Sequence, residues 1–555
     1  MGPPLARPPG MKASGFSRAA SALLLSAACL GASQLIACGG DAEPERSSEI
    51  ATESAARRLS TVELDNTLRD LLGDDTNAAS RVLVSDQYSP YDNDIALQAP
   101  SEALITSLEF MAGDVADRFT ADADRMQAFL GCTPTGADDA VCLRTFVESW
   151  VPVALRRPLE EGEADRYLGL QSFAIEANQY VDNGFATAVN LIVRAVLQQP
   201  EFLYRIETGT KTDNKGVRAL DDWQIAARLS YLLWGTMPDQ ALRDDALAGR
   251  LTNAETRFEV AERMLTDDRA KLQMRRFHAM WLGHRILPQP AELVRAFSNE
   301  TGALIDRVIF DEPQSYYNML TMPETYLDND LADHYGLPRP EGGEGWVTYE
   351  GPPRAGILSH GSVLASFAKF ADTSPTQRGI LIRTRLMCDT IDPPPPTLDV
   401  DSPPGDAEAL CKYDRYAQHR ETTSCAACHA EMDPIGFGLE NFDMQGRYRE
   451  HDEGLPECII AGQGSAPGVG EFSGPKELAE TLIESGRLEA CIMKNFYQFT
   501  IGREIADVEQ PVVDALLETF QSEGRDMRAL MLSFIGSERF ALRREFRGIT
   551  EEVAP

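Results

Sequence analysis

Apolar residues recur at helical spacing along most of this chain, whereas clean alternation of apolar and polar residues is rare. The first clear case follows Ser60-Thr61-Val62-Glu63, which has the order of a capping box. Four leucines then share one helical face: Leu64, Leu68, Leu71 and Leu72. Because glycine is suited to close a helix, the pattern predicts a helix that ends at Gly73.

Three later stretches carry the same pattern. They are the apolar run from Phe185 to Gln199, which stops at Pro200, the run after Asp221 that holds Trp223, Ala226, Ala227, Ser230 and Trp234 before Gly235, and a run from residues 252–255 toward His284. Each predicts a helix, and the second and third have a polar residue at their start. The expected fold class is therefore mainly α, with a multi-module helical body.

Residues 392–406 interrupt the helical pattern. Pro393 to Pro396 are consecutive, and Ser402-Pro403-Pro404 follows. Consecutive prolines favour a stiff, extended segment that cannot continue a helix. We therefore expect a Pro-rich linker here.

The first residues have the order of a secretory signal. Arg7, Lys12 and Arg18 precede an uncharged run from Ala19 to Ala37, which ends directly before Cys38. This order resembles the lipobox of bacterial lipoproteins, so residues 1–37 are expected to be a signal peptide and Cys38 the lipidated residue. The alternative is an ordinary cleaved signal in which Cys38 is incidental. With Cys38 lipidated, residues 38–55 are expected to be a flexible tether. No later apolar run is long enough to span a membrane.

The composition is that of a globular protein with a strong negative charge. The 555 residues are 43% hydrophobic and 25% charged, and the net charge is −34. Loss of residues 1–37 removes three positive charges and no negative one, which makes it −37. Such a charge argues against nucleic acid or an anionic membrane surface as a partner.

Cys425-Ala426-Ala427-Cys428-His429 is the most specific motif of the chain. Its spacing is that of covalent haem c attachment, with two thiols one helical turn apart and His429 as the axial ligand of the iron. The alternatives are a redox disulfide and half of a zinc site, but no second ligand pair at short spacing is present. We expect one haem c and a cytochrome-c-like helical segment around it.

The residues that follow suggest a haem pocket. Asp433-Pro434 would end a helix begun at the motif, and four apolar residues can wall the haem: Ile435, Phe437, Leu439 and Phe442. Arginines can pair with haem propionates, and the candidates are Arg447, Arg449 and Arg503. Ordinary ion pairing in an acidic protein is the alternative for all three.

The distal ligand of the iron stays open. Met432 is too close to His429 to cross the porphyrin plane and is expected in the core. Met444, His451 and Met493 are far enough along the chain to reach the other face. His/His, His/Met and open sites are all possible. The remaining histidines, His419 among them, are expected to be structural.

Six further cysteines form an even set, as expected in an oxidising compartment. By proximity in the sequence we predict Cys132–Cys142, Cys388–Cys411 and Cys458–Cys491, although six cysteines allow 15 connectivities. Cys388–Cys411 would join the two ends of the Pro-rich linker.

Several motifs together resemble one family. They are Thr373-Ser374-Pro375-Thr376-Gln377-Arg378-Gly379, Cys388 with Pro393 to Pro396, the Cys425 to His429 motif with residues 432–443, residues 58–73, residues 155–159, residues 220–223 through 281–282, and residues 472–475 with Cys491 and residues 501–503. They resemble the planctomycete-cytochrome-associated family of exported bacterial proteins. That family is a series of domains of unknown function, numbered 1587, 1595, 1592, 1588 and 1585 in that order.

The resemblance covers nearly all of the chain after the signal. It implies N-terminal helical modules at 56–210, a central helical module at 217–345, and haem-binding C-terminal modules at 354–545 that include the linker at 392–406. Larger members carry an additional N-terminal cytochrome module, and its C-x-x-C-H is missing here. One haem at most is therefore implied.

Three functions follow as hypotheses. The first is a membrane-anchored, exported mono-haem protein that transfers electrons to a periplasmic or surface redox partner. The second is a haem enzyme with an open distal site that acts on peroxide or an organic substrate. The third is a non-catalytic surface binding lipoprotein in which Cys425 and Cys428 form a disulfide.

Overall fold

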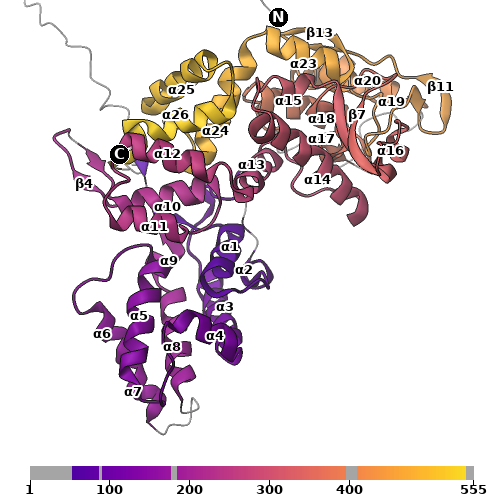
Figure 1. Cartoon of the computed structure of the whole chain (residues 1–555). Helices are drawn as coiled ribbons and strands as arrows, with labels where there is room; N and C mark the ends of the chain where they lie inside the picture. Colours follow the sequence, from indigo (N-terminus) through magenta and orange to yellow (C-terminus); the bar gives the residue numbers. More distant parts are fainter. Residues whose placement is uncertain are drawn as a thin grey trace, which may run out of the picture. The chain divides into compact units, whose positions relative to one another are not determined.

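The computed structural model describes residues 53–54, 56–84, 86, 90–176, 184–214, 216–369, 371–395 and 409–545. These residues belong to one compact unit (Figure 1). The expected signal peptide, Cys38 and nearly all of the tether lie outside the described residues, as do residues 396–406 of the expected linker. No helix among the described residues has the length and apolar character to cross a membrane.

The N-terminal third is helical. Its elements are β1 (Glu53–Ser54), β2 (Arg57–Arg58), α1 (Thr61–Leu72), α2 (Ala78–Val82), α3 (Glu102–Ala121), α4 (Ala123–Leu130), α5 (Ala140–Leu155), α6 (Glu163–Leu168), α7 (Leu170–Ile175), α8 (Phe185–Leu197), α9 (Pro200–Leu203) and β3 (Tyr204–Arg205). Their apolar faces form one core, to which α10 adds Tyr231.

The central part continues this architecture with one longer hairpin. Its elements are β4 (Thr210–Lys211), β5 (Val217–Ala219), α10 (Asp222–Leu233), α11 (Gln240–Leu247), α12 (Ala254–Met264), α13 (Asp268–Trp281), α14 (Ala291–Asp306), α15 (Asn318–Thr321), β6 (Glu324–Asp328), α16 (Asn329–Tyr335) and β7 (Glu344–Thr348). β6 and β7 pair antiparallel.

The C-terminal part alternates short helices with hairpins. Its elements are α17 (Gly361–Ser366), β8 (Ala368–Lys369), β9 (Asp372–Thr373), α18 (Pro375–Leu381), the π-helical segment η5 (Ile382–Leu386), α19 (Lys412–Arg415), α20 (Ala417–Glu421), α21 (Thr423–His429), α22 (Asp433–Phe437), β10 (His451–Asp452), β11 (Leu455–Ile459), β12 (Gln463–Ala466), β13 (Gly470–Ser473), α23 (Gly474–Glu484), α24 (Arg487–Ile501), α25 (Gln510–Ser522), α26 (Met527–Gly536) and β14 (Leu542–Glu545).

The central and C-terminal parts share one large core, which runs from Leu220 to Phe540 and also takes in Tyr91. Residues distant in the sequence also meet in a small sheet with the order β1-β14-β5-β4, in which β14 pairs antiparallel with β5. The mainly α expectation is confirmed for the described residues.

The locally encoded helix ends agree well with the sequence. Ser60 and Glu63 form the predicted capping box of α1, and Gly73 closes that helix in the left-handed conformation with φ 66°. Asp221 caps α10 as expected. The long helix expected from residue 252 toward His284 is wrong in one respect: the Asp267 side chain caps a new helix, so α12 and α13 are separate.

Two of the three predicted disulfides are wrong. Cys132 pairs with Cys142 as predicted, but Cys388 bonds to Cys491 and Cys411 bonds to Cys458. The predicted Cys388–Cys411 and Cys458–Cys491 bonds assumed that neighbours in sequence are neighbours in space. Instead, Cys388, just after η5, lies beside Cys491 of α24, with their Cα atoms 5.3 Å apart. Cys411, just before α19, lies beside Cys458 of β11, with their Cα atoms 5.2 Å apart.

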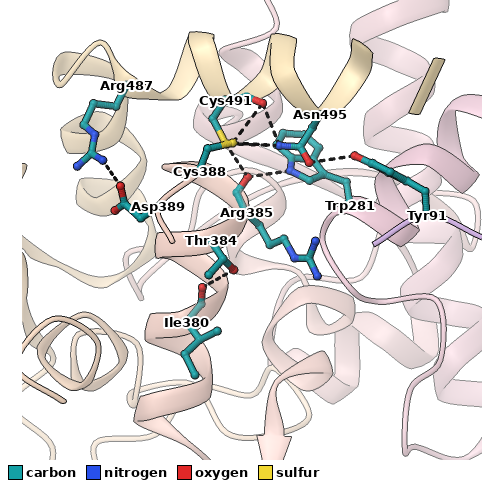
Figure 2. The surroundings of a disulfide bond; sticks show 10 residues. All are labelled: Tyr91, Trp281, Ile380, Thr384, Arg385, Cys388, Asp389, Arg487, Cys491 and Asn495. Atoms are coloured by element: carbon teal, nitrogen blue, oxygen red, sulfur yellow. Dashed lines mark hydrogen bonds and ion pairs between the residues drawn. A yellow bond between two sulfur atoms is a disulfide. The ribbon is translucent and has the colours of Figure 1, made fainter. Parts of the chain in front are cut away.

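Figure 2 shows that the Cys388–Cys491 bond lies where four parts of the chain meet. The Trp281 indole donates to the carbonyl of Arg385 at 2.8 Å, and the Asn495 amide donates to the carbonyl of Cys491 at 2.9 Å. The Tyr91 hydroxyl in turn donates to Asn495 Oδ1 at 3.0 Å. The bond thus sits among contacts from the first, central and last parts of the described chain.

Candidate functional site

The Cys425 to His429 motif forms helix α21. Neither Cys425 nor Cys428 is in a disulfide; Cys425 is half-buried and Cys428 is exposed. Because the two residues are three positions apart in a helix, their thiols lie on one side of it. The helix ends at His429, and Asp433-Pro434 then begins α22, so the predicted break after the motif is confirmed.

His429 is held by the side chain of Asp433, and so is a second histidine. His429 Nδ1 lies 3.0 Å from Asp433 Oδ1, and His419 Nδ1 lies 2.9 Å from Asp433 Oδ2. The two imidazole rings stack, with centroids 3.6 Å apart and planes inclined by 29°. One carboxylate therefore orients two imidazoles, which is the arrangement that fixes the tautomer and direction of metal-binding histidines.

Asp433 is ionised in this setting. Burial by itself would raise the pKa of its carboxyl group, but hydrogen bonds from His419, His429 and Thr376 outweigh burial and lower that pKa. Thr376 donates its hydroxyl proton to Asp433 Oδ1 at 2.7 Å. The side chain is only 3% exposed, so its charge is compensated by these hydrogen bonds rather than by water.

Two glycines bring Thr376 to Asp433. A Cβ on Gly379 of α18 would overlap the backbone of Met432, and a Cβ on Gly436 of α22 would overlap the backbone of Pro375. Helices α18 and α22 can pack this closely only because both positions lack a side chain. The hydrogen bond from Thr376 to Asp433 thus depends on backbone contact between two short helices.

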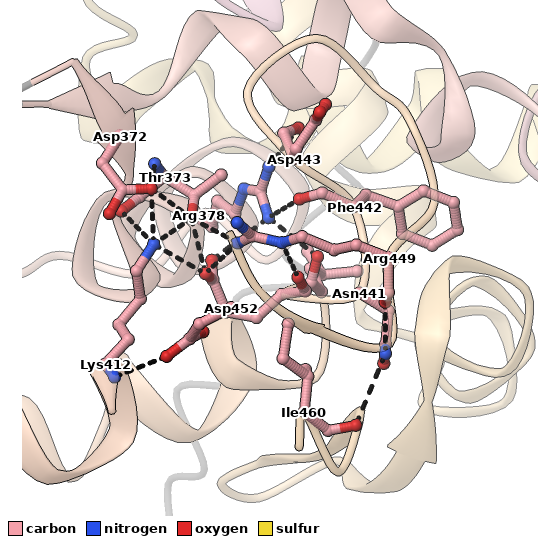
Figure 3. Close-up of polar contacts among 12 residues, drawn as sticks. Asp372, Thr373, Arg378, Lys412, Asn441, Phe442, Asp443, Arg449, Asp452 and Ile460 are labelled. Atoms are coloured by element: carbon pink, nitrogen blue, oxygen red, sulfur yellow. Dashed lines mark hydrogen bonds and ion pairs between the residues drawn. The ribbon is translucent and has the colours of Figure 1, made fainter. Parts of the chain in front are cut away.

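A buried ionic network supports the same region (Figure 3). Arg378 of α18 donates to the carbonyls of Leu439 and Phe442 at 2.7 and 2.8 Å and pairs with Glu440 at 3.2 Å. Lys412 and Arg449 reach the other oxygen of Glu440 at 3.2 and 3.0 Å. Three cations therefore converge on one buried carboxylate, which ties residues 439–442 to α18 and α19.

A cavity of about 640 Å³ opens beside the two histidines. His419, His429 and Asp433 all line it, and α21 contributes Ala426 and Ala430 as well. Phe437 and Phe472 supply apolar wall, whereas Arg420, Glu471 and Glu477 supply charge. Cys425 and Cys428 lie on the same helix beside the cavity and are not part of its lining. The volume is in the range of cofactor sites.

The predicted propionate-binding arginines lie elsewhere. Arg503 makes a bidentate pair with buried Glu509, with both distances 2.7 Å. Arg447 pairs with Asp443, and Arg449 pairs with Glu440. The two arginines line a separate cavity of about 390 Å³. None of the three lines the cavity at His429, and all three make ion pairs with carboxylates of the chain. Their role toward haem propionates stays a prediction.

The predicted distal ligands do not reach the cavity either. Met493 is fully buried in the large core, Met444 lies against Gln289 through its carbonyl, and His451 is in β10. Met432 is buried, as expected. Of the four predicted wall residues, Phe437 lines the cavity, whereas Ile435, Leu439 and Phe442 are core residues.

Sequence reasoning missed His419, Asp433 as an anchor, and Thr376. His419 lies ten positions before His429, and this spacing matches no metal-binding motif, so no local signal marked His419. The rings meet because α20 and α21 fold back on each other. Asp433, by contrast, follows His429 by four positions. Side chains at this spacing are neighbours in a helix, so the sequence alone could have predicted their contact.

A second polar cluster lies inside the central part. Glu300 is 1% exposed and accepts hydrogen bonds from Thr325 and Tyr335, both at 2.7 Å. His360 Nε2 lies 3.8 Å from Glu300 Oε1. Burial raises the pKa of Glu300 to about 7 and lowers the pKa of His360 to about 3. These groups line none of the three cavities described for the protein.

Five family models match the chain in sequence. Each is described as a protein of unknown function: DUF1587 at residues 57–121, DUF1595 at 142–207, DUF1592 at 220–337, DUF1588 at 354–452 and DUF1585 at 470–540. The search of curated proteins and the search of solved structures gave no match. The order of the five modules is the one expected from the resemblance, and the chain belongs to the planctomycete-cytochrome-associated family.

Proposed function

We propose that this protein is a membrane-anchored, exported mono-haem c-type protein that transfers electrons. The observation that carries the proposal is the arrangement of the two thiols and the imidazole on α21. Two thiols outside any disulfide lie on one side of a helix that ends in His429, and the hydrogen bond of His429 to Asp433 uses Nδ1. Nε2 is then the ring nitrogen available to an iron atom.

The residues present fit a covalently attached haem. Exposed Cys428 and half-buried Cys425 are accessible for thioether bonds, and the adjacent cavity has two phenylalanines for the porphyrin edge. Haem bound here would supply a one-electron redox couple. Cys425 and Cys428 would hold it in place, and His429, whose direction Asp433 sets, would bind its iron.

Asp433 would also make His429 a stronger ligand for a metal. A carboxylate that accepts the Nδ1 proton of an imidazole makes the other nitrogen a stronger donor to a metal. Thr376 and His419 limit how far the carboxylate can move, because each occupies part of its hydrogen-bonding capacity. A stronger imidazole ligand would favour the oxidised state of a bound haem.

The cellular setting of the proposal comes from the sequence. A lipid on Cys38 would anchor the protein to a membrane at the periplasmic face or the cell surface, and a redox partner there would exchange electrons with it. The tether expected from the sequence at residues 38–55 would give the body reach from the anchor. The negative charge of the protein favours a basic partner surface.

A second candidate is a haem enzyme with an open distal site. The lining of the cavity includes no methionine, and its histidines are His419 and His429, which share one carboxylate. Gln463, Ser465 and Glu471 line it instead. A haem without a strong sixth ligand would bind carbon monoxide or cyanide readily, which an electron carrier with two strong axial ligands resists.

The test is expression of the exported chain together with cytochrome-maturation machinery. We expect one covalently bound haem per chain by mass spectrometry and a c-type spectrum on reduction. The double variant Cys425→Ala, Cys428→Ala should lose both. Ala427→Ser, at an exposed position of the same helix, is the control and should keep both. Folded but colourless protein with Cys425 and Cys428 joined as cystine would overturn the proposal in favour of the binding lipoprotein.

A further inference from the structure

We propose that, before haem is attached, His419, His429 and Asp433 form a binding site for one first-row divalent cation of the Fe(II), Co(II) and Zn(II) class. The site goes beyond the proposed haem function because it uses His419, which the C-x-x-C-H motif does not include. It would make the haem-free chain a metal-binding protein in its own right.

The donor geometry carries this inference. One donor atom from each of the three residues lies within 4.8 Å of the other two, and they are the one such group among the described residues. His419 Nδ1 and His429 Nδ1 are 2.9 and 3.0 Å from different oxygens of Asp433. Two ligands about 2.0–2.2 Å from one ion, at right angles, are themselves about 3 Å apart. The side chains therefore need only small movements to enclose an ion.

The donor set selects the class of ion. Two imidazoles and one carboxylate are the ligands of mononuclear iron and zinc centres that keep open positions. Magnesium and calcium prefer sites made of oxygen ligands alone. Thr376 supplies the supporting hydrogen bond to the carboxylate, as outer-shell groups do in metal sites.

The cavity gives the ion access and room for further ligands. His419, His429 and Asp433 all line it, so an ion can enter without opening the core. The exposed fractions of the two histidine side chains are 17% and 23%, which leaves them partly shielded from water. Positions of the ion that the protein does not fill would face the cavity.

Haem and the ion would exclude each other at His429. A neutral imidazole has one lone pair, so a ring that binds iron through Nε2 keeps its proton on Nδ1, and a ring that binds through Nδ1 keeps it on Nε2. Attachment of haem therefore removes one of the three ligands. The pair His419 and Asp433 alone would be a poor site.

The experiment uses the full exported chain, made in a host without cytochrome-maturation machinery, and Co²⁺ alone as the probe. We expect one Co²⁺ per chain by equilibrium dialysis, with a visible d–d absorption band. His419→Ala should weaken binding roughly tenfold or more. His419→Gln, which can still donate to Asp433, is a second variant that should bind as weakly while its circular dichroism spectrum stays unchanged.

Two controls separate this site from others. His334→Ala, in α16, should leave the Co²⁺ affinity unchanged. Cys425→Ser with Cys428→Ser should also leave it unchanged, whereas loss of binding in that variant would assign the ion to the thiols and overturn the proposal. Absence of a stoichiometric Co²⁺ site would overturn it as well, and so would His419 variants that bind Co²⁺ as tightly as the unmodified protein.

The haem-loaded protein gives a separate comparison. It should bind Co²⁺ at least tenfold more weakly than the haem-free chain, and equal affinity would place the ion elsewhere. Covalent haem is measured by mass and Co²⁺ by dialysis, so either can fail alone. Co²⁺ binding by a chain that never acquires haem would contradict only the proposed function.

Discussion

His419 and His429 stack face to face with ring centroids 3.6 Å apart, and their Nδ1 atoms meet the two oxygens of one carboxylate, that of Asp433. Two imidazoles in such contact would repel each other if both were protonated, and the ionised carboxylate between them reduces that repulsion. The geometry of His429 is therefore not set by the haem motif alone. It depends on a residue ten positions earlier and on one four positions later.

Asp433→Asn should change the redox properties of the haem-loaded protein. The amide keeps the shape of the carboxylate but loses its charge, so His429 becomes a weaker donor and the oxidised iron is less stabilised. A tenfold to hundredfold loss in the affinity of the site for oxidised iron, relative to reduced iron, corresponds to a rise in reduction potential of about 60–120 mV. Spectroelectrochemical titration measures this shift. Asp414→Asn, at an exposed position of α19, should leave the potential unchanged.

Gly436→Ala should destabilise the protein. The added Cβ would overlap the backbone of Pro375 and force α18 away from α22. We expect a loss of about 3 kcal/mol in the free energy of unfolding, measured with a chemical denaturant. Gly184→Ala is the control because its backbone is extended, with φ 169°, and nothing lies within 4 Å of its Cβ. Equal stability of the two variants would show that the helices are not in close contact.

Glu440→Gln tests the ionic network of Figure 3. The substitution leaves Arg378, Lys412 and Arg449 without their shared carboxylate, and two of these cations are buried. Removal of one partner from a buried ion pair typically costs about 3–5 kcal/mol. We expect a decrease of that size in the free energy of unfolding. Glu480→Gln, at an exposed position of α23, should change it by less than about 0.5 kcal/mol.

Glu300→Gln should change how stability depends on pH. Burial raises the pKa of Glu300 to about 7, so the folded protein retains this proton while the unfolded chain releases it near its ordinary pKa. The contribution of Glu300 to stability is present at low pH and is lost as pH rises through about 7.

The stability of Glu300→Gln relative to the native protein should therefore increase by about 3 kcal/mol between about pH 4 and pH 8. Denaturant unfolding of both proteins across this range measures the difference. Glu292→Gln, exposed on the same helix α14, should show no such trend. A constant difference across the range would mean that Glu300 is ionised throughout.

The sequence was sufficient where structure is encoded locally. Ser60, Glu63 and Gly73 predict both ends of α1 because capping depends on residues within one turn. The helix break after His429 follows from Asp433-Pro434 for the same reason. Cys132–Cys142, ten residues apart, also belongs to this class.

The sequence was insufficient where residues meet through tertiary packing. Cys388 and Cys491 are 103 positions apart, and nothing near either one marks the other. His419 carries no motif and reaches His429 only because α20 folds against α21. Arg503 has the charge expected of a propionate ligand, but both of its terminal nitrogens donate hydrogen bonds to Glu509, six positions later.

The sulfur bridge between Cys388 and Cys491 also determines what a single peptide-bond cleavage can do. A protease that nicks the chain once at any point between these two residues produces two fragments that remain covalently joined. The haem-motif region would then stay with the rest of the molecule on a non-reducing gel and separate from it only after reduction. Proteolysis in that interval would therefore yield a nicked but intact particle rather than a released fragment.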